Sequence, residues 1–112
     1  MPDLVSDAVA LEQFVHSHPI CVLYFSTPDC GVCTAVKPKL SAMLERGFPE
    51  IAFAEVDCVL SPALAAGYSV FSVPTLIVFT EGRESLRKSR SFGLGGLSAE
   101  LERPYSLLYG GN

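Results

Sequence analysis

Residues 20–33 read ICVLYFSTPDCGVC and decide how this chain folds. Residues 20–25 are apolar throughout and rich in β-branched and aromatic side chains, which predicts a central strand covered on both faces. Residues 34–44 have the apolar spacing of a helix. Cys30 and Cys33 therefore lie at a strand-to-helix turn.

The spacing of these two cysteines suits reversible disulfide chemistry. Positions i and i+3 share a helix face, with Cβ atoms roughly 5–6 Å apart, whereas a disulfide needs about 3.5–4.5 Å. A slightly tightened first turn can therefore join Cys30 to Cys33. The helix N-terminus adds partial positive charge and free N–H groups, which stabilise a thiolate.

The other two cysteines do not suggest a second disulfide. Cys21 opens the strand, and at about 3.3 Å per residue it lies some 20–30 Å from Cys30. A zinc site needs four ligands, or three and a water, and only Cys58 can approach the pair from elsewhere. We therefore predict a redox-active pair and no metal site; a metal knuckle and two inert thiols are the alternatives.

Length, composition and charge limit the kind of protein. The chain has 112 residues, 49% of them hydrophobic and 18% charged, which predicts a single domain over residues 1–112. Its net charge of −4 disfavours nucleic acid and anionic membranes as partners. No apolar run approaches a membrane span, and the N-terminus does not resemble a signal peptide, so a cytoplasmic location is expected.

The remaining sequence alternates between helix and strand signals. Ser6 is a candidate N-cap for a first helix, Leu4-Val5 can form a very short strand, and Arg46-Gly47 looks like the end of the second helix. The predicted helices are 7–17, 31–45, 62–66 and 98–109, and the predicted strands are 20–26, 51–57, 75–79 and 84–90. Residues 91–96 contain three glycines and are expected to form a loop.

This order of elements resembles the thioredoxin fold. The residues that carry the resemblance are Phe25, the Cys30-Gly31-Val32-Cys33 motif, Pro38 inside the second helix, Glu55-Val56-Asp57, Val73-Pro74-Thr75 and Gly93. The resemblance implies an α/β protein with a central four- to five-stranded mixed sheet flanked by about four helices. It also implies a cis bond before Pro74, facing the dithiol.

The same resemblance suggests which residues contact a substrate. A proline opening a central strand removes a ladder hydrogen bond, which makes its position unusual. Only about 5–6% of X–Pro bonds in folded proteins are cis, so a cis bond here would be a specified feature. With it, Val73 can pair its backbone with an extended peptide. The expected groove comprises Asp29, Gly31, Val32, Cys58, Val73, Pro74 and Gly93. For Cys58 itself, a partly buried apolar residue is favoured over an accessory redox role.

These expectations favour a thiol–disulfide oxidoreductase. Cys30 is the expected nucleophile, Cys33 the resolving thiol, and Glu55 either the proton acceptor for Cys33 or a salt-bridged carboxylate. We expect protein or small disulfides as substrates, a reductase as electron donor, no cofactor besides the Cys30–Cys33 disulfide, and a monomer. The alternative is a non-catalytic binding module, because Asp29, Val32 and Tyr24 stand where thioredoxins usually have Trp, Pro and a buried aspartate.

Overall fold

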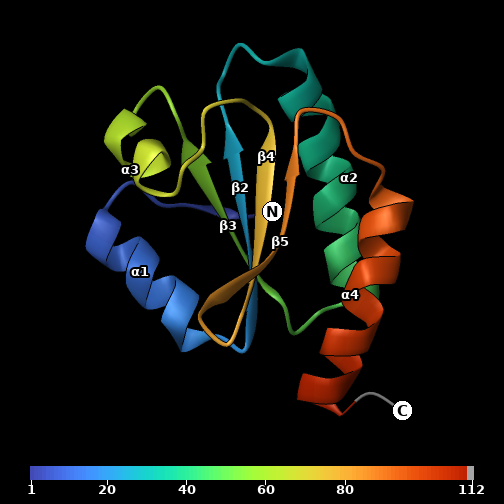
Figure 1. Ribbon diagram of the computed structural model, residues 1–112. Helices are drawn as coiled ribbons and strands as arrows, with labels where there is room; N and C mark the ends of the chain where they lie inside the picture. Colours follow the sequence, from blue (N-terminus) through green and yellow to red (C-terminus); the bar gives the residue numbers. More distant parts are fainter. Residues whose placement is uncertain (111–112) are drawn as a thin grey trace.

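The computed structural model describes residues 1–110, which form a five-stranded mixed sheet with helices on both faces (Figure 1). The elements in chain order are β1 (Asp3–Leu4), α1 (Ala8–Ser17), β2 (Ile20–Ser26), α2 (Gly31–Gly47), β3 (Ala52–Asp57), α3 (Pro62–Gly67), β4 (Thr75–Thr80), β5 (Arg83–Ser89) and α4 (Leu94–Tyr109). The thioredoxin fold predicted from the sequence is confirmed.

The sheet has the strand order β1-β3-β2-β4-β5, so β2 lies at its centre. β3 runs parallel to β2 on one side, and β4 runs antiparallel to it on the other. This register places Ser26 opposite Asp57 and Phe25 opposite Thr75. The ends of β2 and β3 and the start of β4 therefore meet at one edge of the sheet.

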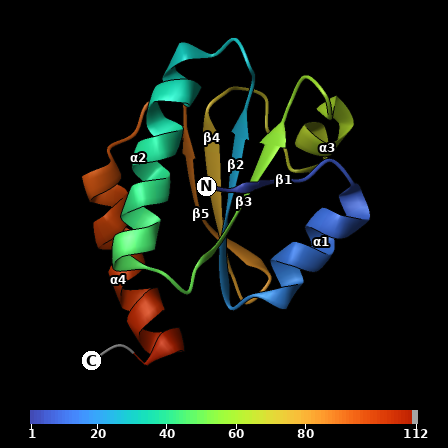
Figure 2. The same cartoon turned by 180° about the vertical axis from the view of Figure 1, so that it is seen from behind.

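β2 is buried along its whole length because it contributes to two cores. Cys21, Leu23 and Phe25 pack into the core beneath α1 and α3. Val22 and Tyr24, on the opposite face, pack into the core beneath α2 and α4. Figure 2 shows the same two layers from behind, with β1 beside β3. The continuously apolar sequence of residues 20–25 reflects this burial on both faces.

Several predicted boundaries are wrong by a few residues. The N-cap of α1 is Asp7 rather than Ser6, because the Asp7 carboxylate accepts a hydrogen bond from the Ala10 N–H at 2.9 Å. The short first strand is Asp3–Leu4 instead of Leu4-Val5. Gly47 belongs to α2, whose C-cap is Phe48.

The largest error concerns the start of α4. The helix begins at Leu94, inside the segment expected to be a loop, and continues through Pro104 to Tyr109. Glycine disfavours helix by about 1 kcal/mol, which is why the sequence suggested a loop. Leu97 and Leu101 are buried against the sheet, and Lys88 pairs with Glu100 at 2.8 Å. These tertiary contacts outweigh the low propensity of the first turn.

Candidate active site

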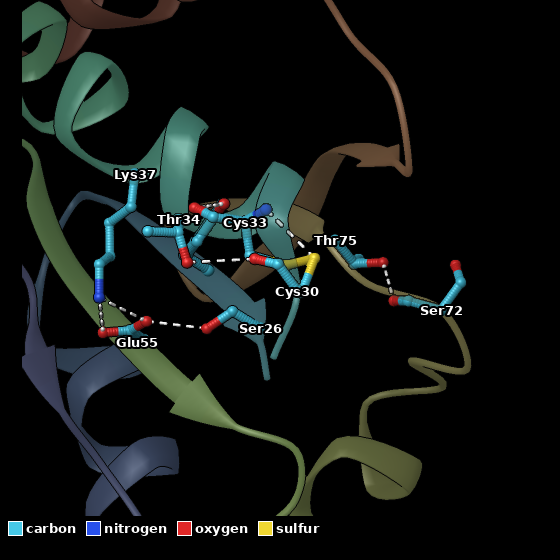
Figure 3. The surroundings of a disulfide bond; sticks show 9 residues. Ser26, Cys30, Cys33, Thr34, Lys37, Glu55, Ser72 and Thr75 are labelled. Carbon is cyan, nitrogen blue, oxygen red and sulfur yellow. Dashed lines mark hydrogen bonds and ion pairs between the residues drawn. A yellow bond between two sulfur atoms is a disulfide. The ribbon is translucent and has the colours of Figure 1, made fainter. Parts of the chain in front are cut away.

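Cys30 and Cys33 form a disulfide at the start of α2, with their Cα atoms 5.2 Å apart. Cys30 is the N-cap of the helix, and its Sγ accepts a hydrogen bond from the Cys33 N–H at 3.1 Å. The Cys30 carbonyl accepts hydrogen bonds from both the backbone N–H and the hydroxyl of Thr34 (Figure 3). A donor already directed at the Cys30 sulfur stabilises negative charge there.

The two sulfurs differ in accessibility. Cys30 is half-buried, whereas Cys33 is only 2% exposed. The hydroxyl of Tyr24, which is itself fully buried, donates a hydrogen bond to the Cys33 carbonyl at 2.8 Å. Burial and the nearby Glu55 charge raise the pKa of Tyr24 to about 12, so its phenol stays neutral. Tyr24 is a core residue, as the sequence predicts, and it anchors the first turn of α2.

Three of the predicted groove residues belong to this turn itself. Asp29, Gly31 and Val32 are exposed, and the side chain of Val32 is 55% exposed. Val73 packs against the same apolar core as Cys30, and Pro74 is buried. The Val73–Pro74 bond is cis, the isomer expected from the sequence.

The segment containing Pro74 is held by polar contacts on both sides. The Thr75 hydroxyl donates to the Ser72 carbonyl at 2.7 Å (Figure 3), and the Arg90 N–H donates to the Pro74 carbonyl at 2.7 Å. Gly93 is exposed and is the N-cap of α4. A Cβ built on Gly93 would meet no described atom within 4 Å, so packing in the free protein does not require glycine there.

Cys21 and Cys58 are free thiols. Cys58 follows β3, and its N–H donates to the Ser26 carbonyl at 2.9 Å, so it lies at the same edge of the sheet as the disulfide. Its side chain, however, packs against the core beneath α1 and α3, on the opposite face from Cys33. Burial and the Asp57 charge raise the pKa of Cys58.

A cavity of about 340 Å³ opens beside Cys33. Its walls include Ser26, Cys33, Lys37, Glu55 and Asp57. The Glu55 side chain is 13% exposed and forms an ion pair with Lys37, whose Nζ lies 3.1 Å from both carboxylate oxygens. The Ser26 hydroxyl donates to Glu55 Oε2 at 2.8 Å. Glu55 is thus salt-bridged and lines the same cavity as Cys33.

Sequence reasoning identified Glu55 but missed Lys37 and Ser26. For Lys37 a signal was present, because it lies four residues after Cys33 and so shares its helix face. Ser26 lies two residues after Tyr24 on β2, which places both on one face of the sheet. Within residues 1–110, no group of three or more His, Cys, Asp or Glu side chains could hold a metal ion. In the same part of the chain, no helix is both long and apolar enough to cross a bilayer.

Known proteins resemble this chain in sequence and in fold. The thioredoxin family model matches residues 4–101. The chain is 36% identical over 102 residues to the thioredoxin-like protein YdfQ of Bacillus subtilis, a match that covers 91% of this chain and 90% of that protein. It is 36% identical over 88 residues to a thioredoxin of Chlamydia trachomatis, covering 77% and 82% of the two chains. A solved mutant thioredoxin from Halobacterium salinarum matches with a TM-score of 0.81 and 25% identity, covering 90% of this chain and 88% of that one.

Proposed function

The chain belongs to the thioredoxin family of thiol–disulfide oxidoreductases, and we propose that Cys30 and Cys33 reduce disulfides in proteins or small molecules. The observation that carries this proposal is the pairing of a half-buried Cys30 with a buried Cys33 at the N-terminus of α2. Proteins of this family work through a redox-active disulfide, which an intact Cys30–Cys33 pair supplies. The intact pair also favours this activity over a purely binding role.

The reaction starts with the thiolate of Cys30. Its sulfur attacks one sulfur of the substrate disulfide, so that a mixed disulfide forms and the first substrate thiolate leaves. Cys33 then loses its proton and attacks the Cys30 sulfur. This second step forms the Cys30–Cys33 disulfide and releases the other substrate thiolate, so two electrons pass from the dithiol to the substrate.

Glu55 is the proposed acceptor of the Cys33 proton. Both groups line the same cavity, which is large enough for water to bridge them. Tyr24, which contacts the Cys33 backbone, is unsuited to this role because its pKa of about 12 describes a phenol that holds its proton. General-base assistance of this kind contributes roughly 10²–10⁴-fold to a proton-transfer step.

The proposed substrate groove surrounds the Cys30 side of the disulfide. Asp29, Gly31 and Val32 form its helix side, and Val73 and Pro74 its strand side. An extended peptide would pair with the Val73 backbone, and Gly93 would leave room for it. The expected place of Cys58 in this groove is dropped, because its side chain packs into the core beneath α1 and α3, whereas Cys30 and Val73 pack against the other core. A reductase as electron donor, a monomeric state and a cytoplasmic location remain predictions from the sequence.

The test is an insulin-disulfide reduction assay with dithiothreitol as reductant, preceded by a redox titration of the Cys30–Cys33 pair. The unmodified protein and Cys58→Ser should both accelerate precipitation of the insulin chains. Cys30→Ser and Cys33→Ser should lose most of this acceleration. If the Cys30–Cys33 pair titrates reversibly but neither the unmodified protein nor Cys58→Ser accelerates insulin precipitation, the result would favour the non-catalytic binding module.

A further inference from the structure

Lys37, Glu55 and Ser26 form a connected group on the wall of the cavity beside Cys33. They come from α2, β3 and β2 respectively, three elements that meet only in the folded protein. Figure 3 shows the Lys37 side chain extending from α2 toward Glu55, with Ser26 on the other side of the carboxylate. We call this group the Glu55 cradle.

The cradle fixes the orientation of one carboxylate. Lys37 contacts both oxygens, while Ser26 contacts only Oε2. Each carboxylate oxygen has about two lone-pair sites. Oε1, which accepts only from Lys37 among these three contacts, therefore keeps a site that can take a proton, while Oε2 is held by two donors.

The other polar groups near Cys33 are occupied differently. The Tyr24 hydroxyl is directed at the Cys33 carbonyl, 2.8 Å away. Asp57 also lines the cavity, but its Oδ1 accepts hydrogen bonds from the Val59 and Leu60 N–H groups at 2.8 and 3.2 Å, so this carboxylate stabilises the turn after β3. Glu55 lines the same wall but is held by side chains from two other elements, Lys37 of α2 and Ser26 of β2, rather than by the backbone of a turn.

We infer that Lys37 and Ser26 are positioning residues that hold Glu55 Oε1 ready to take the proton of Cys33 during the resolving step. This inference rests on the proposed oxidoreductase function. As Cys33 Sγ bonds to Cys30 Sγ, its proton passes through water in the cavity to Oε1, and the substrate thiolate leaves with the electron pair of the broken bond. In the reverse direction, protonated Glu55 returns the proton to the departing Cys33 sulfur.

A two-phase reaction can separate the two sulfur steps. The reduced protein, in a Cys58→Ser background, is mixed in a stopped-flow instrument with excess dithiobis(nitrobenzoate). Attack by Cys30 releases one thionitrobenzoate, and attack by Cys33 on the resulting mixed disulfide releases a second. Thionitrobenzoate is a stable thiolate that needs no proton to leave, so the second phase reports on Cys33 alone.

The variants should act on the second phase. Glu55→Gln should slow it roughly a hundredfold. Lys37→Met, which keeps an apolar stem but removes the cation, should slow it roughly tenfold or more through misplacement of the carboxylate. Lys37→Arg should recover most of the rate, and the matched control Lys39→Met, an exposed lysine on the same helix, should leave both phases unchanged.

Two further readouts separate positioning from a general structural effect. The double variant Lys37→Met/Glu55→Gln should be no slower than Glu55→Gln alone, because Lys37 acts through Glu55. The defects should also shrink as the pH rises, since hydroxide then removes the thiol proton without an acceptor. A structural weakening would not be corrected by alkali.

The outcomes are distinct. An unchanged second phase in Lys37→Met, or additive effects in the double variant, would overturn the role of Lys37. A slow second phase in Asp57→Asn combined with a normal one in Glu55→Gln would assign the proton to Asp57 and overturn the cradle. If the background protein, which carries Cys58→Ser and no other substitution, released only one thionitrobenzoate, the proposed dithiol function itself would fail.

Discussion

Cys30 has two roles that follow from one position. As the N-cap of α2, its sulfur accepts the Cys33 N–H, where a capping residue usually presents an oxygen. The same hydrogen bond stabilises a thiolate when the disulfide is reduced. Capping of the helix and activation of the nucleophile are therefore one interaction at this residue.

The four cysteines should differ in reactivity because their surroundings differ. In briefly alkylated reduced protein at pH 7, we expect Cys30 to be labelled first, since it is the more exposed thiol of the pair and caps the helix. Cys58 should follow slowly and speed up with pH, because burial raises its pKa. Cys21 should stay unlabelled in the native protein, because burial raises its pKa to about 12.

Mass spectrometry of peptides after short exposure to iodoacetamide measures this order. The same exposure after unfolding in urea is the control, in which all four cysteines should react at similar rates. Faster labelling of Cys33 than of Cys30 in the native protein would show that the nucleophile has been assigned wrongly.

For single residues, the sequence predicted the two cysteines that react but missed Lys37 and Ser26, the side chains that hold Glu55 near Cys33. Cys30, Cys33 and Pro74 are recognisable because each is a special residue type at a special place in a strand or turn. Lys37 and Ser26 are ordinary residue types, and their importance comes from a side-chain contact between α2 and the sheet. Local pattern identifies which face they occupy, but only the packed structure shows that they meet at Glu55.

Between elements, the Tyr24 hydroxyl links β2 to the first turn of α2. In α2 the Thr34 carbonyl would normally accept a hydrogen bond from the backbone N–H four residues later. That residue is Pro38, which has no N–H, so this helical hydrogen bond is absent. The contact from Tyr24 to the Cys33 carbonyl therefore supports a helix start that Pro38 leaves with fewer internal hydrogen bonds. It also keeps the backbone of Cys33 in place beneath its sulfur.

Tyr24→Phe should lower the free energy of unfolding by about 1 kcal/mol at pH 7, through loss of one buried hydrogen bond. The free energy of unfolding should also depend on pH through Tyr24. The pKa of Tyr24 rises from 10.0 to about 12 on folding, so the native state holds a proton that the unfolded chain releases between these values. Stability therefore falls as the pH rises above 10, and the fall should be shallower in Tyr24→Phe.

Urea unfolding at pH 7 and over pH 9–11, followed by far-UV circular dichroism and tyrosine fluorescence, measures both effects. Tyr105→Phe is a useful control, because this tyrosine is only partly buried. Equal slopes of stability against pH in the original protein and in Tyr24→Phe would contradict the account of this side chain.

The elements were predicted well where the sequence pattern is strong and poorly where packing decides. β2 is continuously apolar and was placed correctly at residues 20–26. The first turn of α4 contains Gly95 and Gly96, whose low helix propensity concealed a helix held by buried leucines. Such a helix start depends on contacts with the sheet, which no local pattern contains.

For the whole molecule, the central position of β2 connects the two cores. Its alternate residues are buried in the core beneath α1 and α3 and in the core beneath α2 and α4. We therefore propose that residues 1–112 form a single cooperative domain. The urea titrations described above check this, because the two optical signals should then change at the same urea concentration.

The same arrangement explains how the fold serves the chemistry. The turn after β2 presents Cys30, the end of β3 carries Glu55 to the cavity, and the start of β4 brings Pro74 to the same edge. Residues from sequence positions 26 to 75 are thus assembled around one disulfide. The fold leaves Cys30 partly accessible to a substrate disulfide and keeps Cys33 buried behind it, where it can attack only the Cys30 sulfur.

Trapping of the mixed disulfide tests the central claim most directly. Cys33→Ser in the Cys58→Ser background is mixed with a peptide disulfide, and the products are analysed by intact-mass and peptide mass spectrometry. The account predicts one peptide covalently attached to Cys30, accumulating because the resolving thiol is absent, and no stable adduct with Cys30→Ser in the same background. No adduct at Cys30, or equal trapping in both variants, would contradict it.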